Sequence, residues 1–365
     1  VRVGTIFASM SNGACVIGAG PVNEERLGAM GSDQTNDPRR RENPTTQCRG
    51  MDRREFTKSS VLAAGMVGLT GIATMPSSRA SAASTEISLA AEVTTKTMVD
   101  GTNLTVLQFR DRGGFGPCRL SSGLSVREDD PVTVTLYNAL DREVSLEIPV
   151  VLDDTPRVAP GASNTYDFTA PSAGSYLFCD GVNGGLGRAM GLAGPMVVAP
   201  SDGANRLFQG GPAFDRQHIL VLQELDDRVN RRVASGGDFD MAGFEPNYFF
   251  VNGLSYPHTT TDADTLISMN VGDKVALRFI NAGLITNPMH FHGYHVEVVS
   301  RDRRPETAVV ERDTVPVGAD ECVDVILTCN QPGAYPLHTH YVPGVTANGV
   351  YVNPYGGALI VMNAV

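Results

Sequence analysis

Short runs of alternating apolar and polar residues recur along the second two thirds of the chain, separated by Gly, Pro, Asn and Asp. Clear examples are Val132–Leu136, Ser175–Phe178, Ile219–Leu222, Lys274–Phe279 and Val323–Leu327. Alternation with a period of two residues predicts half-buried strands, and many such strands at regular spacing are typical of β-sandwiches. No segment after Met75 predicts a helix of convincing length, so we expect an all-β fold.

Two stretches of this pattern repeat each other. Residues 124–139 align with residues 267–282 at a constant offset of 143, and both stretches end in Asn-Ala. Residues 174–178 likewise match residues 333–337. The repeat predicts two tandem Greek-key sandwich domains, residues 83–205 and 206–365, each of an ordinary domain size.

The first 82 residues are interpreted as lying outside the folded protein. Residues 1–50 begin with Val and show no period, which favours an untranslated or disordered extension, with a basic arm as the alternative. A charged segment with paired arginines then starts at Met51, followed by a weakly apolar segment and Ala-Ser-Ala at 80–82. This order is typical of a signal peptide of the twin-arginine type, residues 51–82. We therefore expect export to the periplasm or the cell exterior.

Composition excludes some classes of partner. The formal net charge of -11 argues against nucleic-acid binding, which requires clustered Lys and Arg. No apolar run is long enough to predict a membrane span in the exported chain. Four cysteines follow the signal segment, and in an exported protein an even number permits disulfides, although isolated buried thiols are the common alternative. Their pairing stays open: Cys118, Cys179, Cys322 and Cys329.

Histidines are concentrated in the second repeat, where two His-x-His pairs occur. On a strand, residues i and i+2 point to the same face, about 7 Å apart. Two facing pairs would therefore bring four imidazoles around one small volume. Neutral imidazole is the commonest metal ligand, and a set without thiolate suits copper or zinc, with iron or nickel also open. The candidate metal ligands are His290, His292, His338 and His340, whereas His218, His258 and His295 are expected to be solvated or hydrogen-bonded.

From about Leu124 to the C-terminus the sequence resembles the multicopper oxidase family, including its two-domain members and the copper nitrite reductases. The two His-x-His pairs resemble the family's C-terminal motifs, and Gly191–Pro195 and Phe250–Gly253 resemble further landmarks. The resemblance implies cupredoxin-like domains. It also implies copper at the His pairs, which in the family feed a trinuclear cluster that reduces dioxygen. A separate blue copper, held by Cys and two His, accepts electrons from substrate in these proteins.

The sequence departs from the family at the blue, or type 1, copper. Thr339 stands where the family has the Cys of a His-Cys-His motif, and Asn287 and Gly344 stand at the positions of the two other ligands. Thr lacks the soft thiolate that a blue site needs, so we expect no type 1 site in the second domain.

The first domain departs further. The repeat places Glu147 and Pro149 opposite the first His pair, and Cys179 and Gly181 opposite the second. No His follows Cys179 in the next residues, up to Met190, so a blue copper is not expected there either. The first domain is therefore predicted to carry no metal ligands. Cys118 and Cys179 are candidate disulfide partners instead.

Three functions are compatible with these observations. The leading hypothesis is an exported copper-dependent oxidoreductase that binds one or two copper ions at the His quartet and reacts with dioxygen or a small-molecule reductant; its catalytic residues are unassigned. The alternative is a non-enzymatic copper-binding or scaffold protein on the same fold. A weaker third is a hydrolytic zinc site, which would need a general base. Glu297 is the nearest carboxylate in sequence, and no Asp or Glu lies at motif spacing.

Two further expectations follow. The hydroxyls of four tyrosines lie close to the His pairs in sequence, and sheet-edge packing is favoured over a redox role: Tyr294, Tyr341, Tyr351 and Tyr355. The resemblance to two-domain relatives also suggests a homotrimer, with one subunit's second domain against the next subunit's first. Glu147, Pro149, Cys179 and Gly181 would then face another subunit's His quartet.

Overall fold

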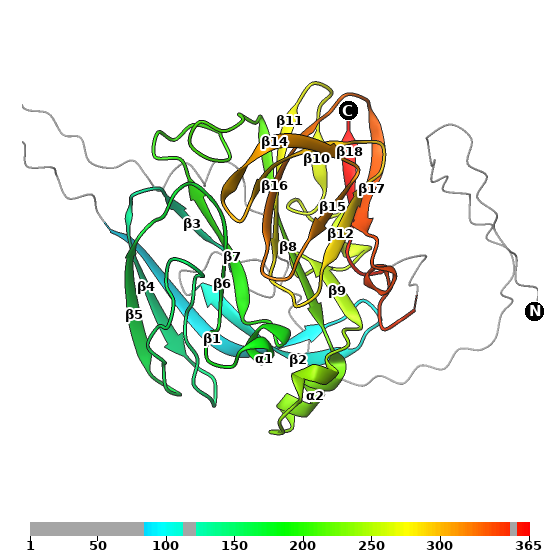
Figure 1. The fold of residues 1–365 in the computed structure, drawn as a ribbon. Coiled ribbons are helices and arrows are strands. Elements are labelled where there is room, and N and C mark those ends of the chain that lie inside the picture. The colour runs from blue at the N-terminus through cyan, green and yellow to red at the C-terminus, as the bar shows by residue number, and fades with distance from the viewer. Residues whose placement is uncertain (1–83, 112–121, 351–355) are drawn as a thin grey trace, which may run out of the picture. The chain divides into compact units, whose positions relative to one another are not determined.

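The computed structural model describes residues 84–111, 122–350 and 356–365 (Figure 1). The expected extension and signal segment, Cys118, Tyr351 and Tyr355 lie outside the described residues. The first group of strands is β1 (Thr85–Thr97), β2 (Asn103–Asp111), β3 (Leu124–Arg127), β4 (Pro131–Asn138), β5 (Ser163–Thr169), β6 (Gly174–Cys179) and β7 (Ala193–Ala199), with the short helix α1 (Gly185–Ala189) before β7.

The second group begins at residue 216. Its strands are β8 (Arg216–Leu225), β9 (Tyr248–Val251), β10 (Ile267–Met269), β11 (Lys274–Asn281), β12 (Asn287–Phe291), β13 (Val296–Arg301), β14 (Arg304–Arg312), β15 (Thr314–Val317), β16 (Cys322–Thr328), β17 (Gly333–Thr339) and β18 (Leu359–Ala364). Its helical elements are α2 (Asp227–Ala234) and the 3-10 turns η1 (Met241–Gly243), η2 (His258–Thr260) and η3 (Val342–Val345).

The strands form two sandwiches, so the predicted all-β fold of two tandem cupredoxin-like domains is confirmed. The first has sheets β2-β1-β4-β5 and β3-β7-β6, and the second has sheets β10-β18-β17-β12-β15 and β14-β13-β16-β11-β8-β9. Alternation along β4 buries Val132, Val134 and Leu136, while the threonines between them are half-exposed. Each sandwich closes over a core with residues from both of its sheets.

The internal repeat is visible in the backbone. The matching segments form β3 with β4 in the first domain and β10 with β11 in the second. The amide of Asn138 donates to the carbonyl of Arg142 at 2.7 Å and accepts from the N–H of Leu140 at 2.9 Å. Asn281 makes the equivalent bonds, to the carbonyl of Ile285 at 2.7 Å and from the N–H of Gly283 at 3.0 Å. One buried Asn therefore holds the same loop in each domain.

The expectation of no convincing helix was wrong at α2. The carboxylate of Asp226 accepts from the N–H of Arg228 at 3.0 Å and caps its N-terminus. Val229 and Val233 lie one turn apart and are buried in the core of the first domain. The helix follows a strand of the second domain, yet it packs on the first. Eight residues are too few for a clear helical period in the sequence.

The two sandwiches meet through β6 and β7 on one side and β8, β11 and β16 on the other. This contact contains an apolar cluster that includes the free thiols of Cys179 and Cys322. It also contains a buried polar group in which the hydroxyl of Ser175 donates to Asp324 at 2.6 Å and accepts from Arg278 at 3.2 Å. The contact is therefore both apolar and specifically hydrogen-bonded.

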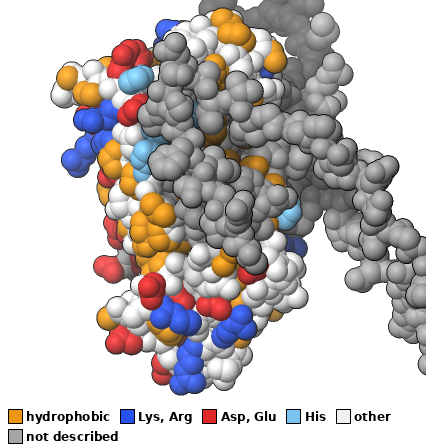
Figure 2. All heavy atoms as spheres, turned by 90° about the vertical axis from the view of Figure 1, so that its right-hand side faces the viewer, with side chains coloured by type: hydrophobic (Ala, Val, Ile, Leu, Met, Phe, Trp, Pro, Cys, Tyr) orange, Lys and Arg blue, Asp and Glu red, His pale blue; other side chains and the backbone are white. Residues whose placement is uncertain are grey.

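The described cysteines are buried free thiols: Cys179, Cys322 and Cys329. This confirms the buried-thiol alternative for Cys322 and Cys329, whereas Cys118, the suggested disulfide partner of Cys179, lies outside the described residues. Burial raises the pKa of Cys179 to about 11, so this thiol stays protonated at neutral pH. None of the helices in the described ranges is long and apolar enough to cross a membrane. Figure 2 shows acidic and basic side chains interspersed over the described surface of one face.

Candidate metal centre

The two His-x-His pairs lie on neighbouring antiparallel strands, β12 and β17. His290 lies directly opposite His338. The backbone N–H of His292 donates to Pro336 and that of His340 to Pro288, at 3.0 and 2.7 Å, which continues the pairing beyond both strand ends. Because side chains alternate along a strand, all four imidazoles share the outer face of the sheet. The residues that alternate with these histidines point into the core and are buried: Met289, Phe291, Leu337 and Thr339.

The structure brings the four predicted residues together. The ring centroids of His290 lie 4.3 Å from His340, 4.8 Å from His292 and 5.8 Å from His338. The Nε2 atoms of His292 and His338 are 3.0 Å apart. Two imidazole nitrogens on one tetrahedral ion, with bonds of about 2.0 Å, lie about 3.3 Å apart. The spacing of this pair is therefore close to that of two ligands on one metal.

Backbone carbonyls orient two of the rings. Nδ1 of His290 lies 3.1 Å from the carbonyl oxygen of Asp313, and Nδ1 of His338 lies 3.0 Å from that of Thr339. A carbonyl can only accept, so Nδ1 carries the proton in both neutral rings and Nε2 keeps its lone pair. Such an anchor on the second nitrogen is usual for a metal-binding His.

Burial keeps three of the rings neutral. Removal from water lowers the pKa of His290, His292 and His338. The proximity of other imidazoles lowers these pKa values further, because two adjacent rings resist carrying like charges. Neutral rings are the form that coordinates a metal, so the cluster presents metal-binding lone pairs at neutral pH.

The donor set fits copper or zinc, but it is not a finished coordination sphere. Within residues 84–111, 122–350 and 356–365, no three His, Cys, Asp or Glu side chains are arranged to hold an ion as they stand. Four imidazoles on one sheet face nevertheless have suitable chemistry and spacing.

The positions of a type 1 site come together without its ligands. Thr339 is buried, and its hydroxyl accepts from the N–H of Tyr341 at 3.2 Å. A Cβ atom on Gly344 would lie 2.5 Å from the γ-methyl of Thr339. The methyl group thus occupies the space that a side chain at position 344 would need, and no thiolate is present in its place.

The first domain carries a different pair at the equivalent position. Glu147 and Cys179 form a β-bridge with both backbone hydrogen bonds at 2.9 Å, as the alignment with His290 and His338 predicts. The Glu147 carboxylate lies over Gly181, where any Cβ would overlap it. Desolvation and the neighbouring aspartates raise the pKa of Glu147. This domain offers one carboxylate and one buried thiol in place of four imidazoles.

The remaining histidines lie elsewhere, and His218 has its Nδ1 3.3 Å from the carbonyl of Asp264. Glu297 lies on β13, in the other sheet of the domain, which removes it as a general base for the quartet. Tyr294 is buried, and its hydroxyl donates to the carbonyl of Gln331 at 2.6 Å, in keeping with a packing role.

Comparison with known proteins agrees with this geometry. Residues 233–353 match the multicopper oxidase family. The chain therefore has a two-domain cupredoxin fold, and its second domain is similar to the multicopper oxidase family. A comparison with curated protein sequences finds no match for this chain.

Solved structures extend the likeness to both domains. A blue copper oxidase from Nitrosomonas europaea is 24% identical, with a TM-score of 0.66 over 77% of this chain and 86% of that one. The multicopper oxidase mgLAC is 25% identical, with the same TM-score and coverage. A copper nitrite reductase from Nitrosomonas europaea is 19% identical, with a TM-score of 0.62 over 78% of this chain and 94% of that one. At 19 and 24% identity, the nitrite reductase and the blue copper oxidase establish a shared fold.

Proposed function

We propose that this multicopper oxidase relative is an exported copper-binding oxidoreductase without a blue copper. The four imidazoles of His290, His292, His338 and His340 would hold one or two copper ions. The observation that carries the proposal is the pairing of the two His-x-His motifs across β12 and β17. The match of residues 233–353 to the multicopper oxidase family supports copper over zinc.

Groups of the protein itself would orient the imidazole rings and bind the metal ion. The carbonyls of Asp313 and Thr339 hold two rings by Nδ1 and leave Nε2 for the metal. In free protein, His292 and His338 share a proton between their Nε2 atoms, and metal binding requires that His292 carry its proton on Nδ1 instead. Bound copper would supply one-electron exchange between a small reductant and dioxygen.

Metal content with stoichiometry tests the proposal. We expect one or two copper ions per chain, weak visible absorption and a type 2-like paramagnetic spectrum, because imidazole-only copper lacks the thiolate that gives an intense blue band. The double variant His290→Ala, His338→Ala should lose most of this copper. The matched double variant His218→Ala, His258→Ala should keep it. Unchanged copper in the first variant would refute the quartet, and an intense blue band would make a cysteine a ligand.

Oxygen consumption separates an enzyme from a scaffold. We expect the copper-loaded protein to consume oxygen with ascorbate, and the His290→Ala, His338→Ala variant to be inactive. Stoichiometric copper binding without oxygen uptake would favour the alternative function, a non-enzymatic copper-binding protein on the same fold.

The exported form should start near Ala83, after the segment 51–82. N-terminal sequencing of the exported protein checks this expectation. A mature chain that starts upstream of Met51 would contradict the signal segment.

We also propose a head-to-tail homotrimer. The outer face of β6 in the first domain is covered by the second domain, whereas the equivalent face of β17 leaves His338 half-buried and His340 exposed. A first domain from another subunit could cover this face in the same way and bring Glu147 towards the quartet. Small-angle scattering should give three times the monomer mass, and a monomer mass would remove any intersubunit metal site.

A further inference from the structure

A second candidate site lies beside the first turn of α2. A cavity of about 340 Å³ opens between this turn, the segment at Glu245 and η3. Its walls include Asp227, Arg228, Glu245, Tyr341 and Pro343. None of the four quartet histidines lines it, although Tyr341 directly follows His340 in the chain.

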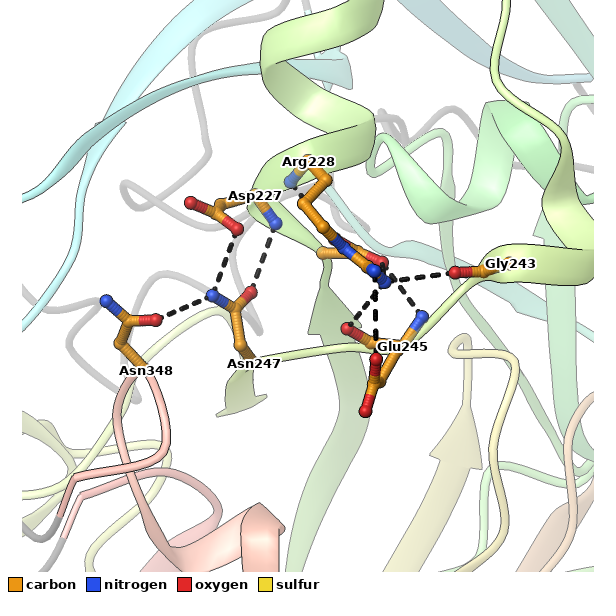
Figure 3. Close-up of polar contacts among 7 residues, drawn as sticks. Asp227, Arg228, Gly243, Glu245, Asn247 and Asn348 are labelled. Atoms are coloured by element: carbon orange, nitrogen blue, oxygen red, sulfur yellow. Dashed lines mark hydrogen bonds and ion pairs between the residues drawn. The ribbon is translucent and has the colours of Figure 1, made fainter.

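The guanidinium of Arg228 is committed to a buried partner. Its Nε and Nη2 atoms donate to the carboxylate of Asp226 at 2.9 and 2.6 Å, and Nη2 also donates to the carbonyl of Gly243 at 3.0 Å. The carboxylate of Glu245 lies 3.7 Å from Nη1, beyond hydrogen-bond distance, and the Glu245 side chain is 82% exposed. Figure 3 shows Arg228 beside both Gly243 and Glu245.

The other carboxylate of the wall is better compensated. Asp227 accepts from the side chains of Asn247 and Arg231, each at 3.1 Å. Two guanidinium groups, of Arg228 and Arg231, therefore face three carboxylates around this end of α2. Of the three carboxylates, Glu245 has the weakest pairing with a positive charge. The cavity wall therefore carries excess negative charge at Glu245.

Apolar and aromatic residues also line this cavity. The Tyr341 ring contacts Phe249 edge to face, with centroids 5.7 Å apart, and Pro246 and Pro343 add apolar surface to the cavity. An aromatic ring attracts a cation to its face, and a nearby carboxylate adds an ion pair. The cavity volume suits a small molecule, and the net charge of -11 favours the approach of cations.

We propose that this cavity binds a small organic cation with an apolar body, of the arylalkylammonium class. The ammonium group pairs with Glu245, and the apolar body lies against Tyr341 and the two prolines. The site is independent of copper and does not rest on the function proposed for the His quartet.

Calorimetric titration of the EDTA-treated full chain tests the charge preference. Three probes of similar shape separate the contributions: phenethylamine as the cation, 2-phenylethanol as the neutral analogue and 3-phenylpropionate as the anion. We expect the order cation, neutral, anion, and weaker phenethylamine binding at high salt. Equal or tighter binding of 3-phenylpropionate would overturn the proposal, as would the absence of binding by all three at millimolar concentrations.

Variants test separately the ion pair with Glu245 and the contact with the Tyr341 ring. Glu245→Gln should weaken phenethylamine binding about three- to fivefold and leave 2-phenylethanol unchanged, because only the ion pair is lost. Tyr341→Leu should weaken phenethylamine about threefold, whereas Tyr341→Phe, which keeps the ring face, should not. The matched control is Glu311→Gln on exposed β14, and melting temperatures verify that each variant is folded. Unchanged binding in Glu245→Gln would remove the assigned carboxylate and overturn the proposal.

Discussion

The two domains share one backbone frame but differ at the equivalent pair of strands. In the second domain a bridge position holds His290 opposite His338, and in the first the same position holds Glu147 opposite Cys179. The imidazoles of His290 and His338 lie on a partly open face, whereas the thiol of Cys179 is buried against the other domain. The comparison teaches that the sandwich fold fixes which strand positions lie opposite each other. The identity of the side chains there, and whether another domain covers them, decide whether they can bind a metal.

The largest expected effect comes from the buried contact between the domains. Asp324→Ala leaves the buried guanidinium of Arg278 without its carboxylate, so we expect a loss of about 3–5 kcal/mol of unfolding free energy. Denaturant unfolding measures it, with Glu311→Ala on exposed β14 as the control. A loss below about 1 kcal/mol would mean that this polar group does not hold the domains together.

Glu224 gives a pH dependence to the loop that leads into β12. Complete burial raises the pKa of Glu224 to about 7 from 4.5, against the opposing N–H donors of Leu284 and Ile285. The folded state then binds the proton more tightly than the unfolded state, so this stability is present below pH 4.5 and is lost as pH rises through about 7.

The loss is about 3 kcal/mol between these limits, because folding raises the pKa from 4.5 to about 7. Glu224→Gln, which stays neutral, should remove this part of the pH dependence in denaturant unfolding measured from pH 5 to 8. An identical pH profile in wild type and variant would rule out a raised pKa for Glu224.

The repeated asparagines test how far the domains are equivalent. Asn138→Ala and Asn281→Ala each remove several buried hydrogen bonds, so each should cost about 2–3 kcal/mol of unfolding free energy. Only Asn281→Ala should also lower copper content, because its loop precedes the strand with His290. Equal loss of copper in both variants would argue that the metal site depends on the first domain as well.

The smallest effect concerns the quartet without metal. Because the pKa values of His290, His292 and His338 are lowered in the folded state, the unfolded state binds protons more readily. Stability from these rings is complete above about pH 6.5 and falls as pH drops towards their lowered pKa values. Copper affinity should fall over the same window, since protonated rings do not coordinate. Ring titration followed by NMR, in wild type and in the His290→Ala, His338→Ala variant, checks the direction.

Much of the fold was predictable from the sequence. Alternation along β4 and β11, and the matching Asn138 and Asn281, indicated two sandwiches because each signal is local to one strand or loop. The His quartet was predictable as a cluster for the same reason, since a period of two places residues i and i+2 on one face. The short helix α2 was missed because packing of Val229 and Val233 against the other domain supports it, more than any periodic pattern.

The sequence by itself determined the strand pattern, the repeat, the candidate ligands and the replacement of the blue-copper thiolate by Thr339. Only the tertiary structure decided that Glu224 is buried beside Gly283, that Ser175 joins Arg278 and Asp324 across the domains, and that Glu245 and Tyr341 line one cavity. These relations join residues far apart in the chain. The polar contacts among these residues are strong because surrounding strands and loops exclude water from them. The local pattern of apolar and polar residues in the sequence does not show this exclusion.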